Sequence, residues 1–153
     1  MAVNMNTGKL LAGGIAAGVV LNIIDFLSNG VVFAQRMQAD ANAFKPGLGD
    51  RFAEMDAGQI AGYVFFDFIV GFLLVWTYAA IRPRFGPGPR TAMYVALLFF
   101  VFGMILTFGY KEMGIMSSGL WWSYSLVWLV NLLLASMVGA WIYSERGADA
   151  ATT

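Results

Sequence analysis

Four long apolar stretches constrain this chain more than any other feature of its sequence. They cover about residues 10–33, 59–81, 92–110 and 121–143. Each is close to the roughly 20 residues that an α-helix needs to cross about 30 Å of hydrocarbon. Helices are expected because an open strand would leave backbone N–H and C=O groups unpaired in lipid. The sequence therefore predicts an all-α protein with four transmembrane helices.

The overall composition agrees with a membrane protein. Apolar residues make up 59% of the chain and charged residues 12%, against roughly 45–50% and about 25% in soluble domains. The 153 residues fit a single membrane domain, 1–153, and the short loops predict up-down connectivity. Lys9 before an apolar run resembles a signal peptide, but the run is too long, so we expect a retained first helix.

The segment 34–58 is polar but largely compatible with helix. Ala34 to Phe44 is expected to continue the first helix, and Lys45-Pro46-Gly47-Leu48-Gly49 to break it. Asp50 is a candidate N-cap for one helix running from Arg51 to Ile81. We therefore predict that the first two helices overshoot the bilayer as a protruding helical hairpin over about 34–58. The alternative is a flexible loop.

The other end of the second span predicts a tight turn and an orientation. Arg82-Pro83 is expected to end the helix, because proline disfavours helix at the preceding residue, and Thr91 is a candidate N-cap for the third. Three arginines lie within 82–90 without an acidic residue, whereas 34–58 carries four acidic residues. Under the positive-inside rule this places both termini in the cytoplasm.

Two ionisable residues, Asp25 and Asp67, fall inside the predicted spans. A carboxylate at mid-bilayer costs about 2.5–3.5 kcal/mol on insertion scales. The two side chains are therefore expected to face each other or water, not lipid. Two carboxyls buried together are not expected to ionise independently. We expect them to share a proton or a bound cation.

Small and polar residues recur at intervals of three and four along each span, which puts them on one helix face. Small residues let helices approach closely in lipid, where the hydrophobic effect does not drive association. Asn22, Asn131 and Thr107 fall at or near the depth of the two acids, so we expect them to line a pocket that opens outward. The expected helix-packing positions are Gly14, Gly18, Gly71, Gly103, Ala135 and Gly139.

Two functional interpretations follow from these residues. One is a non-enzymatic protein that works by helix association, as a homo-oligomer or as an accessory subunit of a larger membrane complex. The other is a small transporter or a proton- or cation-binding protein that uses Asp25 and Asp67. Without His or Cys, we find no metal-ligand set and no nucleophile–base set, so we expect no cofactor and no catalytic residues. Zero net charge argues against nucleic-acid binding.

Two segments carry a resemblance to known sequences. They are Gly18-Val19-Val20-Leu21-Asn22-Ile23-Ile24-Asp25-Phe26 and the segment from Trp76 to Pro89. With them, most of the chain resembles an uncharacterised group of small four-span bacterial integral membrane proteins. The resemblance implies a multi-pass protein of the bacterial cytoplasmic (inner) membrane, and it implies no activity.

Overall fold

The computed structural model of the protein describes residues 5–143, and this part of the chain is helical without strands. Four of its helices are long and apolar enough to cross a membrane: Thr7–Val32, Ala57–Phe85, Pro89–Glu112 and Ser118–Tyr143. This confirms the all-α prediction and the four apolar helices. The helical segments are α1 (Thr7–Leu27), the π-helix η1 (Ser28–Val32), α2 (Ala34–Phe44), α3 (Asp50–Ala53), α4 (Ala57–Phe85), α5 (Pro89–Glu112) and α6 (Ser118–Tyr143).

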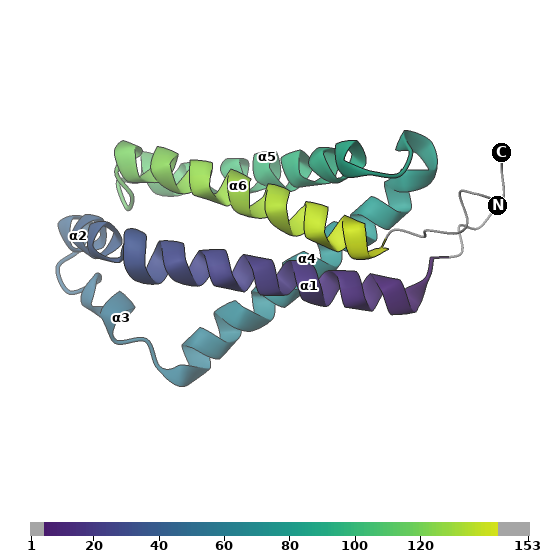
Figure 1. The fold of residues 1–153 in the computed structure, drawn as a ribbon. Coiled ribbons are helices and arrows are strands. Elements are labelled where there is room, and N and C mark those ends of the chain that lie inside the picture. Colours follow the sequence, from purple (N-terminus) through teal and green to yellow (C-terminus); the bar gives the residue numbers. More distant parts are fainter. Residues whose placement is uncertain (1–4, 144–153) are drawn as a thin grey trace, which may run out of the picture.

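The long helices pack around α1 and α6. Figure 1 shows α6 lying beside both α1 and α5, while α4 crosses them obliquely. Successive long helices run in opposite directions, so α2 and the α5–α6 loop lie at one end, and the α4–α5 turn lies at the other. We call these the α2 end and the turn end. Leu21, Leu74 and Leu132 fill the centre and are at most 2% exposed.

Glycines allow α1 to touch its two neighbours closely. A Cβ added at Gly71 of α4 would lie 2.7 Å from the Gly14 carbonyl oxygen of α1. A Cβ added at Gly13 would lie 2.8 Å from the carbonyl oxygen of Gly139 on α6. Such contacts leave no room for a side chain, so backbones meet directly. The expected packing positions are all buried: Gly14, Gly18, Gly71, Gly103, Ala135 and Gly139.

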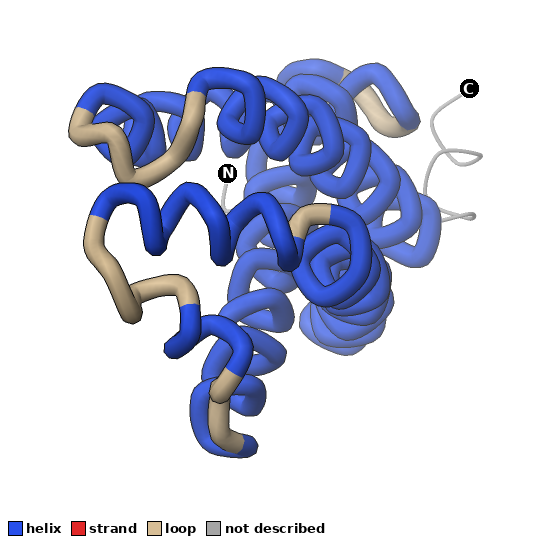
Figure 2. The backbone as a smooth tube through the Cα atoms, turned by 90° about the vertical axis from the view of Figure 1, so that its left-hand side faces the viewer, coloured by secondary structure: helices blue, strands red, loops and turns tan. Residues whose placement is uncertain are grey.

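Beyond the crossing with α1, α4 leaves the other helices toward the α2 end (Figures 1 and 2). Residues 57–66 are exposed on almost every side. The side chains of Tyr63, Phe65 and Phe66 are 62%, 63% and 64% exposed. Tyr63 therefore does not face the interior, although it lies four residues before Asp67 and so on the same helix face.

The segment after α1 turns instead of continuing straight. The π-helix η1 has Gly30 at its centre, and such widened turns are local irregularities within helices. Phe33 follows, buried against the ring of Tyr124 at a centroid distance of 5.9 Å. Figure 2 shows α2 lying across the end of α1. The first half of the predicted protruding hairpin is therefore folded back over the α2 end.

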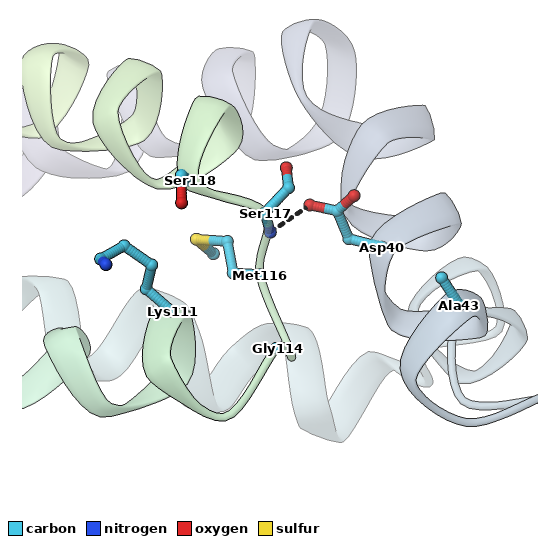
Figure 3. Close-up of a pocket in the computed structure, with 7 residues that line it drawn as sticks. All are labelled: Asp40, Ala43, Lys111, Gly114, Met116, Ser117 and Ser118. Atoms are coloured by element: carbon cyan, nitrogen blue, oxygen red, sulfur yellow. Dashed lines mark hydrogen bonds between the residues drawn. The ribbon is translucent and has the colours of Figure 1, made fainter.

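One hydrogen bond fixes α2 in that position. The Ser117 backbone N–H, just before α6, donates to Oδ2 of Asp40 on α2 at 2.7 Å (Figure 3). An acidic side chain is favourable there, because the N-terminus of a helix carries unpaired N–H groups and a partial positive charge. Asp40 thus connects the polar segment to the last span.

The prediction of one helix from Arg51 to Ile81 is wrong, because α3 ends at Ala53 and α4 begins only at Ala57. Asp56 interrupts the helix by forming a capping box. Its Oδ1 accepts from the Gln59 N–H at 2.9 Å, and Gln59 Oε1 accepts from the Asp56 N–H at 2.9 Å. This reciprocal arrangement satisfies two N–H groups at a helix start.

Asp50, the residue expected to cap that long helix, has another role. Its Oδ1 accepts hydrogen bonds from the side chains of Gln38 at 3.2 Å and Asn42 at 3.3 Å, both on α2. Asp50 therefore holds the single turn of α3 against α2. Sequence alone favoured the cap, because an aspartate after a glycine is typical of helix starts.

The turn end also differs from the prediction. The helix α4 continues through Pro83 to Phe85, although Pro83 has no N–H to donate to the carbonyl oxygen four residues earlier. Thr91 is not an N-cap: Gly88 precedes the helix, and Pro89 is its first residue, a position that suits proline. Thr91 Oγ1 instead donates to the carbonyl oxygen of Gly86 at 2.7 Å.

Candidate functional site

A polar contact between side chains joins α1 to α6. Asn131 is fully buried, and its Nδ2 donates to Oδ1 of Asp25 at 2.9 Å. The same Nδ2 atom lies 3.4 Å from the carbonyl oxygen of Leu21. A buried amide that donates to a carboxyl stabilises that group in an apolar environment. Asp25 is therefore held by a specific partner and does not face lipid alone.

The second acid, Asp67, lies on α4, the helix that crosses α1. It is partly exposed, because it stands where α4 begins to leave the other helices. Asp25 and Asp67 thus stand on two helices that pack against each other. Their surroundings differ, since Asp25 accepts a hydrogen bond from Asn131 whereas Asp67 lies where α4 becomes exposed.

Three further polar residues surround the acids on the side of the α2 end. The Tyr124 hydroxyl is hydrogen-bonded to the Asn29 side chain and interacts electrostatically with Asp25, Asp67 and Tyr63. We had not selected these residues as site candidates. Their spacing was an available signal, since Asn29 follows Asp25 by four residues and Tyr63 precedes Asp67 by four.

Asn22 and Thr107 are placed differently. Asn22 Nδ2 donates to the carbonyl oxygen of Gly18 at 2.9 Å and lies 3.4 Å from that of Val64, so it links α1 to α4 beside the acids. Thr107 is not part of the acidic cluster. Its Oγ1 donates to the Gly103 carbonyl oxygen at 2.9 Å and accepts from Trp121 Nε1 at 3.2 Å.

One buried acceptor in the cluster has no partner within the described part of the chain. It is Oδ1 of Asn131, the oxygen of the same amide that donates to Asp25. Buried polar atoms in folded proteins almost always have a hydrogen-bond partner. This oxygen is therefore an unused hydrogen-bond acceptor among the packed helices.

The cluster is closed toward the turn end. Leu21, Leu74 and Leu132 lie inward of Asp25, Asp67 and Asn131 along their helices, and all three are at most 2% exposed. Tyr124 and Asn29 lie on the side of the α2 end. The site is thus polar on one side and sealed by leucine on the other.

A second polar region lies at the α2 end itself. A pocket of about 330 Å³ opens between α2 and the α5–α6 loop (Figure 3). Lys111 lines this pocket, is paired with Glu112, and lies 4.9 Å from the ring centre of Phe108. The pocket is lined by Asp40, Ala43, Lys111, Gly114, Met116, Ser117 and Ser118.

The acidic cluster offers carboxyl, amide and phenol groups, which hydrogen-bond neighbouring helices or hold a positive charge. Comparisons of the chain with protein-family models, curated proteins and solved structures find no match.

Proposed function

We propose that this is a non-enzymatic, multi-pass membrane protein that works by helix association, with a second copy of itself or as an accessory subunit of a larger membrane complex. One observation carries the proposal. The part of α4 between Ala57 and Asp67 diverges from the other helices and exposes apolar side chains together with a partly exposed acid.

The cost of exposing the Asp67 carboxylate to lipid supports a partner along the diverging part of α4. A carboxylate that faces lipid at membrane depth costs about 2.5–3.5 kcal/mol on insertion scales. A helix packed along the diverging part of α4 would cover Asp67 and Tyr63 and remove much of that cost. Lipid can cover the apolar residues of α4 as well as a protein can, so the acid is what favours a partner.

The diverging part of α4 also has a backbone that a second helix can approach. Gly58 and Gly62 are four residues apart, and a Cβ added at Gly62 would meet nothing within 4 Å. Paired small residues at this spacing are a common contact between membrane helices. In α1 the corresponding pair, Gly14 and Gly18, is already occupied by α4.

We further propose an up-down topology in the bacterial cytoplasmic membrane with both termini in the cytoplasm. Arg82, Arg84 and Arg90 at the turn end support this orientation under the positive-inside rule. The bacterial location is supported by the sequence resemblance described above. In this orientation the turn end is cytoplasmic, so Pro87→Cys is protected from a membrane-impermeant maleimide in intact cells. Ser118→Cys, at the α2 end, is labelled.

Cysteine crosslinking in native membranes tests the proposed association. The chain has no cysteine, so single-Cys variants need no further change. Phe66→Cys tests the diverging part of α4, and Leu106→Cys on α5 is the control, since these side chains are similarly exposed at 64% and 63%. We expect an oxidised dimer, or one discrete adduct with a Cys-bearing membrane protein, only from Phe66→Cys. Equal crosslinking of the two variants, or none, contradicts the proposal.

A further inference from the structure

We propose that the turn end holds the headgroup of an anionic phospholipid, whose phosphate is bound by Arg84 and Arg90. The two arginines flank the α4–α5 turn, with Arg84 in the last turn of α4 and Arg90 in the first turn of α5. The inference goes beyond the proposed helix association, because it needs no protein partner and rests only on the placement of the four long helices in a membrane.

The α4–α5 turn carries unpaired positive charge. The sequence has no acidic residue between Asp67 and Glu112, and no carboxylate pairs with Arg84 or Arg90 in the described part of the chain. Both arginine side chains are exposed. A guanidinium is permanently charged and binds phosphate through two parallel hydrogen bonds. An anionic lipid therefore suits the turn better than a zwitterionic one, whose amine would find no carboxylate on the turn.

The α4–α5 turn is held in one conformation by its own hydrogen bonds. The Gly88 N–H donates to the buried Tyr78 hydroxyl at 2.9 Å, and Thr91 Oγ1 donates to the Gly86 carbonyl oxygen at 2.7 Å. A ligand that meets a preformed turn loses less binding free energy to the ordering of the protein. The backbone that carries the two arginines is therefore ready to bind before the lipid arrives.

The guanidinium of Arg90 is oriented by a neighbouring ring. Its Nε donates to the Tyr94 hydroxyl at 2.7 Å, and its central carbon lies 5.7 Å from the centre of the Tyr94 ring. The two terminal nitrogens of the guanidinium keep their N–H groups for an outside acceptor. Phe85 packs edge-on against Tyr94, and the two side chains are 54% and 38% exposed. These rings give an apolar surface beside the charge, which suits the glycerol and upper acyl chains of the same lipid.

Two tryptophans indicate the depth of the α4–α5 turn. Trp76 of α4 and Trp141 of α6 are 45% and 66% exposed near the turn end. Exposed tryptophans gather at the boundary between hydrocarbon and headgroups. Arg84 follows Trp76 by eight residues on the same helix, so it lies about 12 Å farther along the axis at about 1.5 Å per residue. The arginines are thus placed beyond the hydrocarbon, where lipid phosphates lie.

Native mass spectrometry of the purified full chain in detergent tests the site. We expect phosphatidylglycerol to bind at least about fivefold more tightly than phosphatidylcholine, since one basic residue near anionic lipid contributes about that factor. Arg84→Gln combined with Arg90→Gln should remove the preference. Arg36→Gln combined with Arg51→Gln, which removes the same charge from exposed positions at the α2 end, should retain it.

A wild type that binds both lipids equally overturns the proposal, as does an Arg84→Gln/Arg90→Gln variant that keeps the full preference. Equal loss in the α2-end variant would show that total charge, and not the α4–α5 turn, attracts the lipid. Sodium phosphate at the concentration of the lipid should not displace phosphatidylglycerol. Displacement would identify a site for free phosphate and would overturn the assignment to lipid.

Hydrogen exchange on the wild type locates the lipid without any variant. In nanodiscs of phosphatidylglycerol, peptides covering 84–94 should exchange more slowly than in nanodiscs of phosphatidylcholine, whereas peptides covering 34–44 should not change. Equal exchange of 84–94 in the two lipids contradicts the proposal. Both measurements are made on the purified chain and need no association between chains, so their outcome is separate from that of the crosslinking test.

Discussion

Asn131 on α6 donates a hydrogen bond of 2.9 Å from Nδ2 to Oδ1 of Asp25 on α1, across 106 residues of sequence. The bond connects the first and last spans at the depth where the chain carries its two acids. Asn131 is fully buried, so this contact is shielded from solvent. It holds Asp25 in place, while Oδ1 of the same Asn131 amide is buried without a partner in the described part of the chain.

This bond should appear as a coupling between the two residues. Interhelical hydrogen bonds in membranes average about 0.6 kcal/mol and reach about 1.7 kcal/mol. Because a carboxyl accepts this one, we expect a coupling of about 1–1.7 kcal/mol. A double-mutant cycle of Asp25→Leu and Asn131→Leu, measured by reversible unfolding in mixed micelles, gives the value. Strictly additive losses would show that the contact contributes nothing.

The glycine contact between α1 and α4 should tolerate no added methyl group. Gly71→Ala places its Cβ 2.7 Å from the Gly14 carbonyl oxygen, so we expect a loss of about 1–3 kcal/mol in unfolding free energy. Gly62→Ala is the matched control on the same helix, because its Cβ meets nothing within 4 Å. Unfolding in mixed micelles compares the two. Equal effects of both substitutions would contradict the observed crossing.

The turn end should depend on the hydroxyl of Tyr78. This side chain is 1% exposed, and its hydroxyl accepts from the Gly88 N–H at 2.9 Å. Tyr78→Phe leaves that N–H without its partner, so we expect a loss of about 0.5–1.5 kcal/mol. Tyr94→Phe loses a contact to Arg90 on the surface and should change stability by less than about 0.5 kcal/mol. A larger loss of unfolding free energy in Tyr94→Phe than in Tyr78→Phe would contradict this prediction.

The position of α2 should depend on Asp40. Asp40→Ala removes the acceptor for the Ser117 N–H, so we expect faster hydrogen exchange in peptides covering 34–44 and 115–120. The spans themselves should exchange as in the wild type. Glu54→Ala, outside these contacts, serves as the control. Unchanged exchange in both regions would show that α2 is held by other contacts.

Part of the acidic site was predictable because a helix fixes which residues share a face. Because an α-helix has 3.6 residues per turn, one face of α1 carries Gly14, Gly18, Asn22 and Asp25. The cost of burying a carboxylate predicts that Asp25 and Asp67 face each other or water and not lipid. By the same spacing rule Asn29 lies on the helix face of Asp25, and Tyr124 lies on the helix face of Asn131.

Thr107 shows where this reasoning fails. Its depth suggested a place beside the acids, but depth does not determine how far a helix is rotated about its axis. In the structure α5 packs on α6, with Gly103 against the ring of Trp128 and Thr107 bonded to Trp121. That rotation results from side-chain packing between two helices, which spacing within one helix does not contain.

The sequence by itself determined that there are four apolar helices, because each apolar stretch matches the length needed to cross the hydrocarbon layer. It also determined which face of each helix carries small and polar groups, because helical periodicity sets which residues share a face. Only the tertiary structure decided how those faces meet. The glycine contact of α1 with α4 sets the oblique crossing, and the crossing leaves Asp67 partly exposed while Asn131 is buried against Asp25. Such arrangements depend on contacts between distant residues, so packing geometry and not local pattern determines them.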